Sequence, residues 1–109
     1  VLDELREVLG GEVDKIVAVY LEDAPRLIAQ LERAAVGNDP IALRVAAHTL
    51  KSSSANVGAT TLADAARDLE TGARDGTLTQ PATAVARIVG EFAQVRAALQ
   101  AQLASNGAG

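Results

Sequence analysis

Apolar side chains recur every three or four residues along most of this chain, the spacing that places them on one face of an α-helix. The fullest row runs through the first third of the chain and comprises Val13, Ile16, Val17, Tyr20, Leu21, Ala24, Leu27, Ile28, Leu31 and Ala35. A second row, near the other end, comprises Val85, Ile88, Phe92, Val95, Leu99 and Leu103. No segment alternates apolar and polar residues as a half-buried strand does. The pattern therefore predicts an all-α protein.

Glycine, proline and capping residues divide this pattern into five helices. Two consecutive glycines separate a short first helix from a long second one. Asp39 and Pro40 suit the N-cap and the first position of the third helix, and Thr60 or Thr61 suits the N-cap of the fourth. The predicted helices cover residues 2–9, 12–36, 40–57, 61–74 and 80–104, and residues 105–109 are predicted to form a flexible tail.

Four long amphipathic helices joined by short connections are typical of an antiparallel four-helix bundle. We expect the short first helix to act as a lid on this bundle. At 109 residues the chain has the size of a single domain, and we expect that domain to be monomeric. Tyr20 and Phe92 are its only aromatic residues, so the core must consist mainly of Ala, Leu, Val and Ile.

Composition and charge argue against several classes of function. The chain has no cysteine, so it can form neither a disulfide nor a thiolate metal site. Its one histidine and its scattered carboxylates do not form a cluster of metal ligands. A formal net charge of −4 argues against a nucleic-acid partner. No apolar run approaches the ~20 residues of a membrane span, and no signal-peptide pattern opens the chain. We therefore expect a cytoplasmic domain without membrane contact. Because the chain starts with Val1 rather than Met, we expect it to be part of a longer protein.

The single histidine, His48, lies on the predicted third helix, away from its apolar side. At 100° per residue, His48 is about 160° around the helix from Leu50, which belongs to the row that faces the core. Lys51 follows one turn later, and small residues surround both. An exposed imidazole with a nearby cation and small neighbours suits chemistry with a large anion.

The segment from His48 to Gly58 resembles the signature of histidine-containing phosphotransfer (HPt) domains, which is roughly His-x-Leu-Lys-Gly-Ser/Ala-small-x-x-x-Gly. Residues 20–25 and 62–70 are similar to two flanking segments of the same family. One position departs from the pattern, because Ser52 stands where the family usually has glycine. The resemblance implies a module that relays phosphoryl groups to and from the aspartate of receiver domains. It also implies that Mg²⁺ belongs to the receiver and that this chain needs no cofactor.

Five polar residues have candidate roles in this chemistry. His48 is the expected phosphoacceptor, since an uncharged imidazole has a lone pair that attacks phosphorus without a general base. Lys51 is expected to place its ammonium near the phosphoryl oxygens. The resemblance implies that Glu70, on the flank of the fourth helix, bonds the proximal nitrogen of His48. Glu70 is alternatively a solvated residue paired with Arg67 or Arg74. Those two arginines either add positive potential to the site or are plain surface residues.

Four further residues share the exposed face of the third helix with His48. Ser52 and Ala55 are small, so their side chains do not block a receiver that approaches the imidazole. We expect the Ser52 hydroxyl to bond back to the carbonyl of His48, as helical serines often do. Ile41 and Val45 are apolar where a solvated helix is polar, which indicates a docking surface. The alternative is that the leucines of the lid helix cover them.

Three functions remain open at this point. The first is an HPt phosphorelay module, which is a phosphotransfer intermediate rather than an enzyme, either alone or within a larger hybrid sensor kinase. The second is a helical adaptor bundle that binds a partner without phosphorylation. The third is the phosphorylated N-terminal domain of a chemotaxis-type histidine kinase. One experiment distinguishes the phosphorelay module from the adaptor bundle: only the phosphorelay module gains acid-labile, base-stable phosphate when it is mixed with a phosphorylated receiver.

Overall fold

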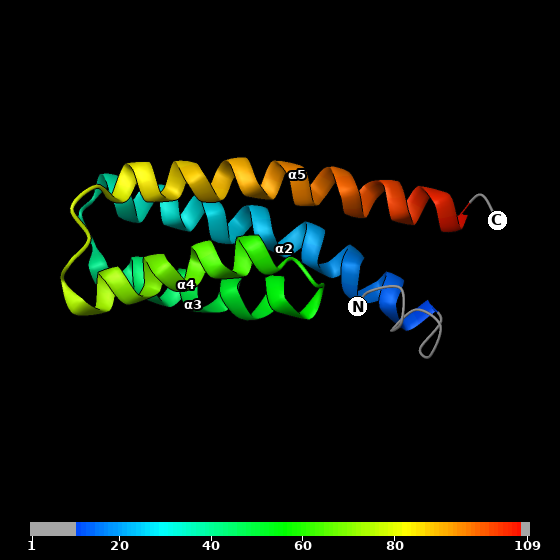
Figure 1. Ribbon diagram of the computed structural model, residues 1–109, viewed down its shortest axis with the longest axis horizontal. Helices are drawn as coiled ribbons and strands as arrows, with labels where there is room; N and C mark the ends of the chain where they lie inside the picture. Colours follow the sequence, from blue (N-terminus) through cyan, green and yellow to red (C-terminus); the bar gives the residue numbers. More distant parts are fainter. Residues whose placement is uncertain (1–10, 108–109) are drawn as a thin grey trace.

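The computed structural model describes residues 11–107, and this part of the chain is built of four helices, shown in Figure 1. They are α2 (Gly11–Val36), α3 (Pro40–Asn56), α4 (Thr60–Asp75) and α5 (Pro81–Gly107). The predictions of an all-α protein and of four long helices are confirmed. The helix predicted over residues 2–9, with its role as a lid, lies outside the described residues.

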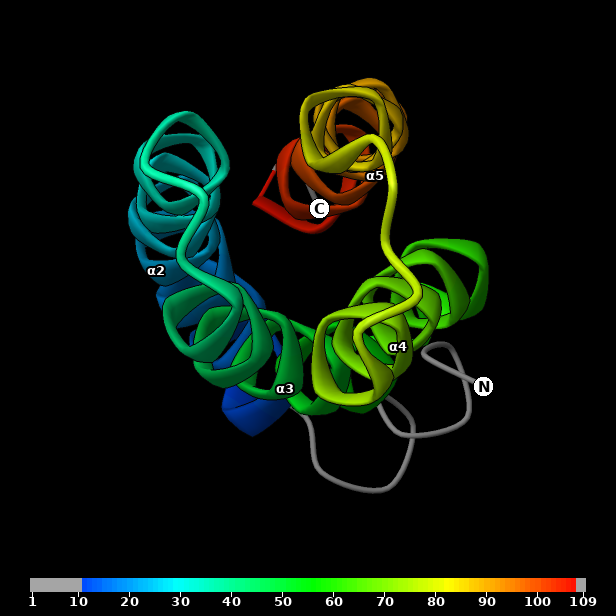
Figure 2. The same ribbon diagram turned by 90° about the vertical axis from the view of Figure 1, so that its left-hand side faces the viewer.

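The four helices run alternately in opposite directions, as Figures 1 and 2 show, and their buried apolar side chains form one core. Helix α3 packs between α2 and α4, while α5 closes the bundle by packing on α2 and α4. The described chain thus forms the antiparallel bundle that short connections favour. In Figure 1, the N-terminal part of α2 and the C-terminal part of α5 extend beyond the other two helices.

The core consists mainly of the predicted apolar rows. Leu31, Leu50, Leu62, Leu69 and Ile88 are its largest fully buried hydrophobic side chains. Ile16 is an exception, because its side chain is 47% exposed although it belongs to the predicted row of α2. It lies in the part of α2 that borders the end of α3 at Asn56, where no further residue of α3 is present to cover it.

A buried hydrogen bond joins α2 to α3 below the exposed face of α3. The hydroxyls of Tyr20 and Ser54 are 2.9 Å apart, and both side chains are buried. Burial raises the pKa of Tyr20 above its ordinary value. The ring of Tyr20 also meets Phe92 of α5 edge to face, with ring centroids 6.1 Å apart. The only two aromatic residues of the chain therefore connect three helices.

The helix ends agree with the predictions in part. The Asp39 side chain accepts a hydrogen bond from the backbone N–H of Ala42 at 3.1 Å, and Pro40 is the first residue of α3, as predicted. The predicted cap of α4 is wrong, because Ala59 occupies the N-cap position and Thr60 is already helical. The left-handed Gly58 (φ 78°) closes α3, and the Ala59 N–H bonds back to Ser54, so the chain enters α4 one residue early.

The predicted flexible tail is also wrong for residues 105–107, because α5 continues to Gly107. Serine, asparagine and glycine favour a helix end locally, but extending an existing helix adds a hydrogen bond for each residue fixed. Residues 108–109 lie outside the described part.

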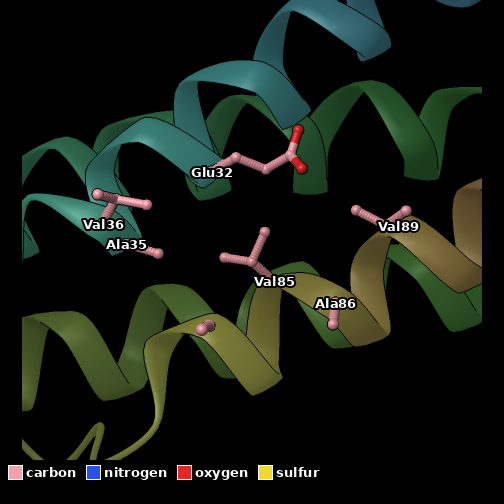
Figure 3. A pocket seen from close by; sticks show the side chains of 7 residues that line it. Glu32, Ala35, Val36, Val85, Ala86 and Val89 are labelled. Atoms are coloured by element: carbon pink, nitrogen blue, oxygen red, sulfur yellow. The ribbon is translucent and has the colours of Figure 1, made fainter.

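An apolar groove of about 330 Å³ separates the C-terminal end of α2 from the start of α5. Figure 3 shows Val36, Val85 and Val89 around it, with Glu32 on one side. It involves neither α3 nor α4 and is therefore distinct from the face that carries His48.

Candidate functional site

His48 lies in the middle of α3 with 61% of its side chain exposed. The residues predicted to face the core from the same helix, Leu43, Ala47, Leu50 and Ser54, are all buried. The prediction that the histidine points away from the core is confirmed. Its ring is open to a large partner.

The ring is held by a carboxylate of the neighbouring helix. His48 Nδ1 and Glu70 Oε2 are 2.7 Å apart, and the Glu70 side chain is 16% exposed. Because an ionised carboxylate only accepts hydrogen bonds, Nδ1 carries the proton and donates it to Glu70. The lone pair of the neutral ring is then on Nε2. The contact implied by the family resemblance is thus present in the structure.

Lys51 binds the second oxygen of the same carboxylate. Its Nζ donates a hydrogen bond to Glu70 Oε1 at 2.7 Å, and 31% of the Lys51 side chain is exposed. The Lys51 ammonium holds the pKa of the Glu70 carboxyl below its usual range; partial burial opposes this effect, and the hydrogen bond from His48 adds to it. Glu70 therefore joins the histidine and the lysine of α3 in one network. The sequence pattern did not predict the bond between Lys51 and Glu70.

Neither nearby arginine of α4 bonds to Glu70. Arg67 pairs with Asp64 at 3.2 Å, and Arg74 pairs with Asp75 at 3.0 Å, which raises the pKa of Arg74. The alternative in which Glu70 is a solvated partner of these arginines is therefore wrong. Both arginine side chains are more than half exposed and border the site without touching the imidazole through any bond among the described residues.

The exposed face of α3 has the composition expected for access by a partner. Ser52 and Ala55 are exposed, and Ile41 and Val45 are 68% and 57% exposed. The predicted lid helix, which is the alternative cover for Ile41 and Val45, lies outside the described residues 11–107. Two grooves border this face: one of about 560 Å³ beside Ile41 and Val45, between α2 and α3, and one of about 360 Å³ beside Ser52, between α3 and α4.

The expectation for the Ser52 hydroxyl is wrong. Thr49 and Ser53 bond back to carbonyls of their own helix, but Ser52 makes no side-chain hydrogen bond with any part of the chain that the structure describes. Ser52 lies on the exposed face of α3, where water can satisfy its hydroxyl. Its oxygen is therefore open to whatever approaches His48.

Comparison with known proteins identifies the family. The family model described as the Hpt domain matches residues 15–104. The chain belongs to the Hpt domain family. Its fold is also that of histidine-containing phosphotransfer protein B (HptB) from Pseudomonas aeruginosa PAO1, with a TM-score of 0.90 and 31% sequence identity over 95% of this chain and 90% of the HptB chain. None of the curated proteins is similar enough to be matched to it.

This Hpt domain is a histidine phosphotransfer module of phosphorelay signalling. Modules of this family are relay intermediates. Among residues 11–107, no three potential metal ligands cluster together, and no helix is both long and apolar enough to cross a membrane.

Proposed function

We propose that His48 is the phosphoacceptor of this Hpt domain and that its Nε2 exchanges a phosphoryl group with the aspartate of receiver domains. The observation that supports this most directly is the 2.7 Å contact between His48 Nδ1 and Glu70 Oε2. This contact supports a proton on Nδ1 and a lone pair on Nε2, in a side chain that is 61% exposed. A histidine without this partner has no fixed tautomer.

In the proposed step, the Nε2 lone pair attacks the phosphorus of an aspartyl phosphate. An N–P bond forms while the O–P bond breaks, and the bonding electrons return to the receiver's carboxylate. The ring gains positive charge, which the Glu70 carboxylate stabilises across the Nδ1–H bond. Transfer to another receiver is the same step in reverse. The domain acts as an intermediate without turnover of its own.

Lys51 has two parts in this proposal. In the resting domain its ammonium holds Glu70 in place at 2.7 Å. During transfer its charge lies beside the imidazole and favours the negatively charged phosphoryl group, because phosphoryl transfer depends mainly on position and charge. Arg67 and Arg74 add positive potential from α4. We propose that the metal ion of the reaction is held by the receiver and that this domain needs no cofactor.

We propose that the receiver docks on the exposed face of α3. Ile41 and Val45 supply apolar contact on one side of His48, and Ser52 and Ala55 leave room on the other. An exposed row of apolar side chains next to a reactive group is typical of a partner surface.

The direct test is incubation of the untagged domain with a phosphorylated receiver domain. We expect acid-labile, base-stable phosphate on the wild-type chain and none on His48→Gln, since His48 is the only histidine. The variant should keep its helicity and melting temperature, because an exposed side chain outside the core contributes little to stability. Phosphate that persists on His48→Gln would assign the reaction to another residue.

A further inference from the structure

Arg44 lies one turn before His48 on the exposed side of α3 and has no partner among the described residues. Between residues 11 and 107, no side-chain hydrogen bond and no ion pair involves Arg44. The three other cations around the site are all engaged: Lys51 with Glu70, Arg67 with Asp64, and Arg74 with Asp75. Among these four cations, Arg44 is thus the one that forms no ion pair with the described part of the chain.

Helix geometry places Arg44 next to the reactive ring. Residues four apart have Cβ atoms about 5–6 Å from each other on a helix surface. Helical side chains also lean toward the N-terminus, which brings the imidazole of His48 over the turn that carries Arg44; the Arg44 side chain leans the same way, so its long stem must turn back to bring the guanidinium to the ring. Lys51 leans toward His48 from the following turn, but its ammonium is bound to Glu70. Arg44 is therefore the cation with free donors on the N-terminal side of the ring.

Phosphorylation changes the charge of this site strongly. A protein-bound phosphoryl group brings about −1.5 to −2 charges and three acceptor oxygens at neutral pH. The Glu70 carboxylate, with its lowered pKa, is already negative, and Lys51 compensates only one charge. A guanidinium presents paired N–H donors that match two phosphoryl oxygens, which an ammonium does not.

We propose that Arg44 binds the phosphoryl group on His48 and stabilises the phosphorylated form of the domain. The inference rests on the proposed role of His48. No bond to phosphorus is made or broken by Arg44; its guanidinium donates hydrogen bonds to the phosphoryl oxygens. Because this contact exists only after phosphorylation, Arg44 shifts the equilibrium of transfer toward the domain and is without effect on the unphosphorylated fold.

Two measurements on Arg44→Ala test this. First, the untagged domain is phosphorylated with phosphoramidate, which modifies imidazoles, and the pH titration of its single phosphohistidine is followed by ³¹P NMR. A neighbouring guanidinium favours the dianion, so we expect the titration midpoint of Arg44→Ala to lie about half a pH unit higher than that of the wild type. Second, the ratio of phosphorylated domain to phosphorylated receiver at equilibrium should fall about two- to fivefold.

The matched control is Arg87→Ala, which removes the same charge from α5, a helix that packs on α2 and α4 rather than on α3. Arg87→Ala should leave both measurements at the wild-type value, and Arg44→Lys should lie between wild type and Arg44→Ala. An unchanged ³¹P midpoint in Arg44→Ala overturns the inference, even if transfer becomes slower, since Arg44 would then contact the receiver. A wild-type domain that accepts phosphate from phosphoramidate but from no receiver overturns the proposed function instead.

Discussion

Replacing Glu70 with alanine removes the carboxylate that receives both His48 Nδ1 and Lys51 Nζ at 2.7 Å. The ring then loses the acceptor that fixes its proton on Nδ1, and the positive ring formed during transfer loses its nearest negative charge. Lys51 loses its only bonding partner among the described residues. We therefore expect slower transfer from a domain that remains folded.

The size of the effect follows from the geometry. Opposite unit charges about 4 Å apart interact by about 1 kcal/mol in bulk water and about 4 kcal/mol near a protein surface. Glu70 is 16% exposed but His48 is 61% exposed, so an intermediate value of about 1.5–3 kcal/mol applies to the charged ring. This corresponds to a rate of transfer lower by about ten- to a hundredfold. The lost pair with Lys51 is partly exposed and costs at most about 1 kcal/mol of stability.

The assay is rapid-quench transfer from a phosphorylated receiver in a single turnover, together with ¹⁵N NMR of the single imidazole, which reports the nitrogen that carries the proton. Asp68→Ala is the matched control, because it removes an exposed carboxylate from the same helix that pairs with Arg87 rather than with the site. We expect Asp68→Ala to transfer at the wild-type rate. If Glu70→Ala transfers at that rate too and keeps the proton on Nδ1, the carboxylate does not orient the ring and the reasoning is refuted.

Three further results are expected. Lys51→Ala should slow single-turnover transfer about ten- to a hundredfold, ~1.4–2.7 kcal/mol, and an unchanged rate would make Lys51 an ordinary surface residue. The carboxyl pKa of Glu70 is lowered in the folded chain, so the stability that Glu70 contributes is present above the ordinary pKa of 4.5 and is lost as the pH falls through the lowered pKa. The difference in melting temperature between wild type and Glu70→Ala should therefore vanish in acid. A difference that stays constant with pH would contradict the ion pair. Ser52→Gln should sharply reduce the rate of transfer while the domain stays folded. Ser52→Gly should transfer within about threefold of the wild-type rate and lose roughly 0.5 kcal/mol of helix stability. A Ser52→Gln domain that transfers at the wild-type rate would show that the receiver does not dock over this face.

Most of the helices and the orientation of His48 follow from the order of residues alone. The rotation of about 100° per residue relates neighbours in the chain to one another, so the apolar row through Leu50 already places His48 on the opposite side. The Asp39 cap is equally local, since a side chain three residues away from the Ala42 N–H is within reach in any helix start. The signature from His48 to Gly58 is contiguous in the chain, so it can be recognised without the tertiary structure.

The preferences of single side chains gave the wrong helix end where the backbone of neighbouring residues favoured another one. The serine, asparagine and glycine near the C-terminus favour an end to the helix, yet α5 continues to Gly107 because each added residue gains a backbone hydrogen bond. Thr60 has the side chain of a capping residue, yet it lies inside α4, because the turn at Gly58 brings the chain into the helix at Ala59.

The partners of Glu70 were decided only by tertiary structure. Along α4, Arg67 and Arg74 are three and four residues from Glu70, and sequence spacing alone favours them as strongly as it favours any residue of α3. The antiparallel packing of α3 on α4 brings His48 and Lys51 to 2.7 Å from its two oxygens, while the arginines pair with Asp64 and Asp75. The same packing brings Tyr20 to Ser54 across 34 positions of the chain. Contacts of this kind depend on the relative offset of two helices, which the periodicity within each helix does not contain.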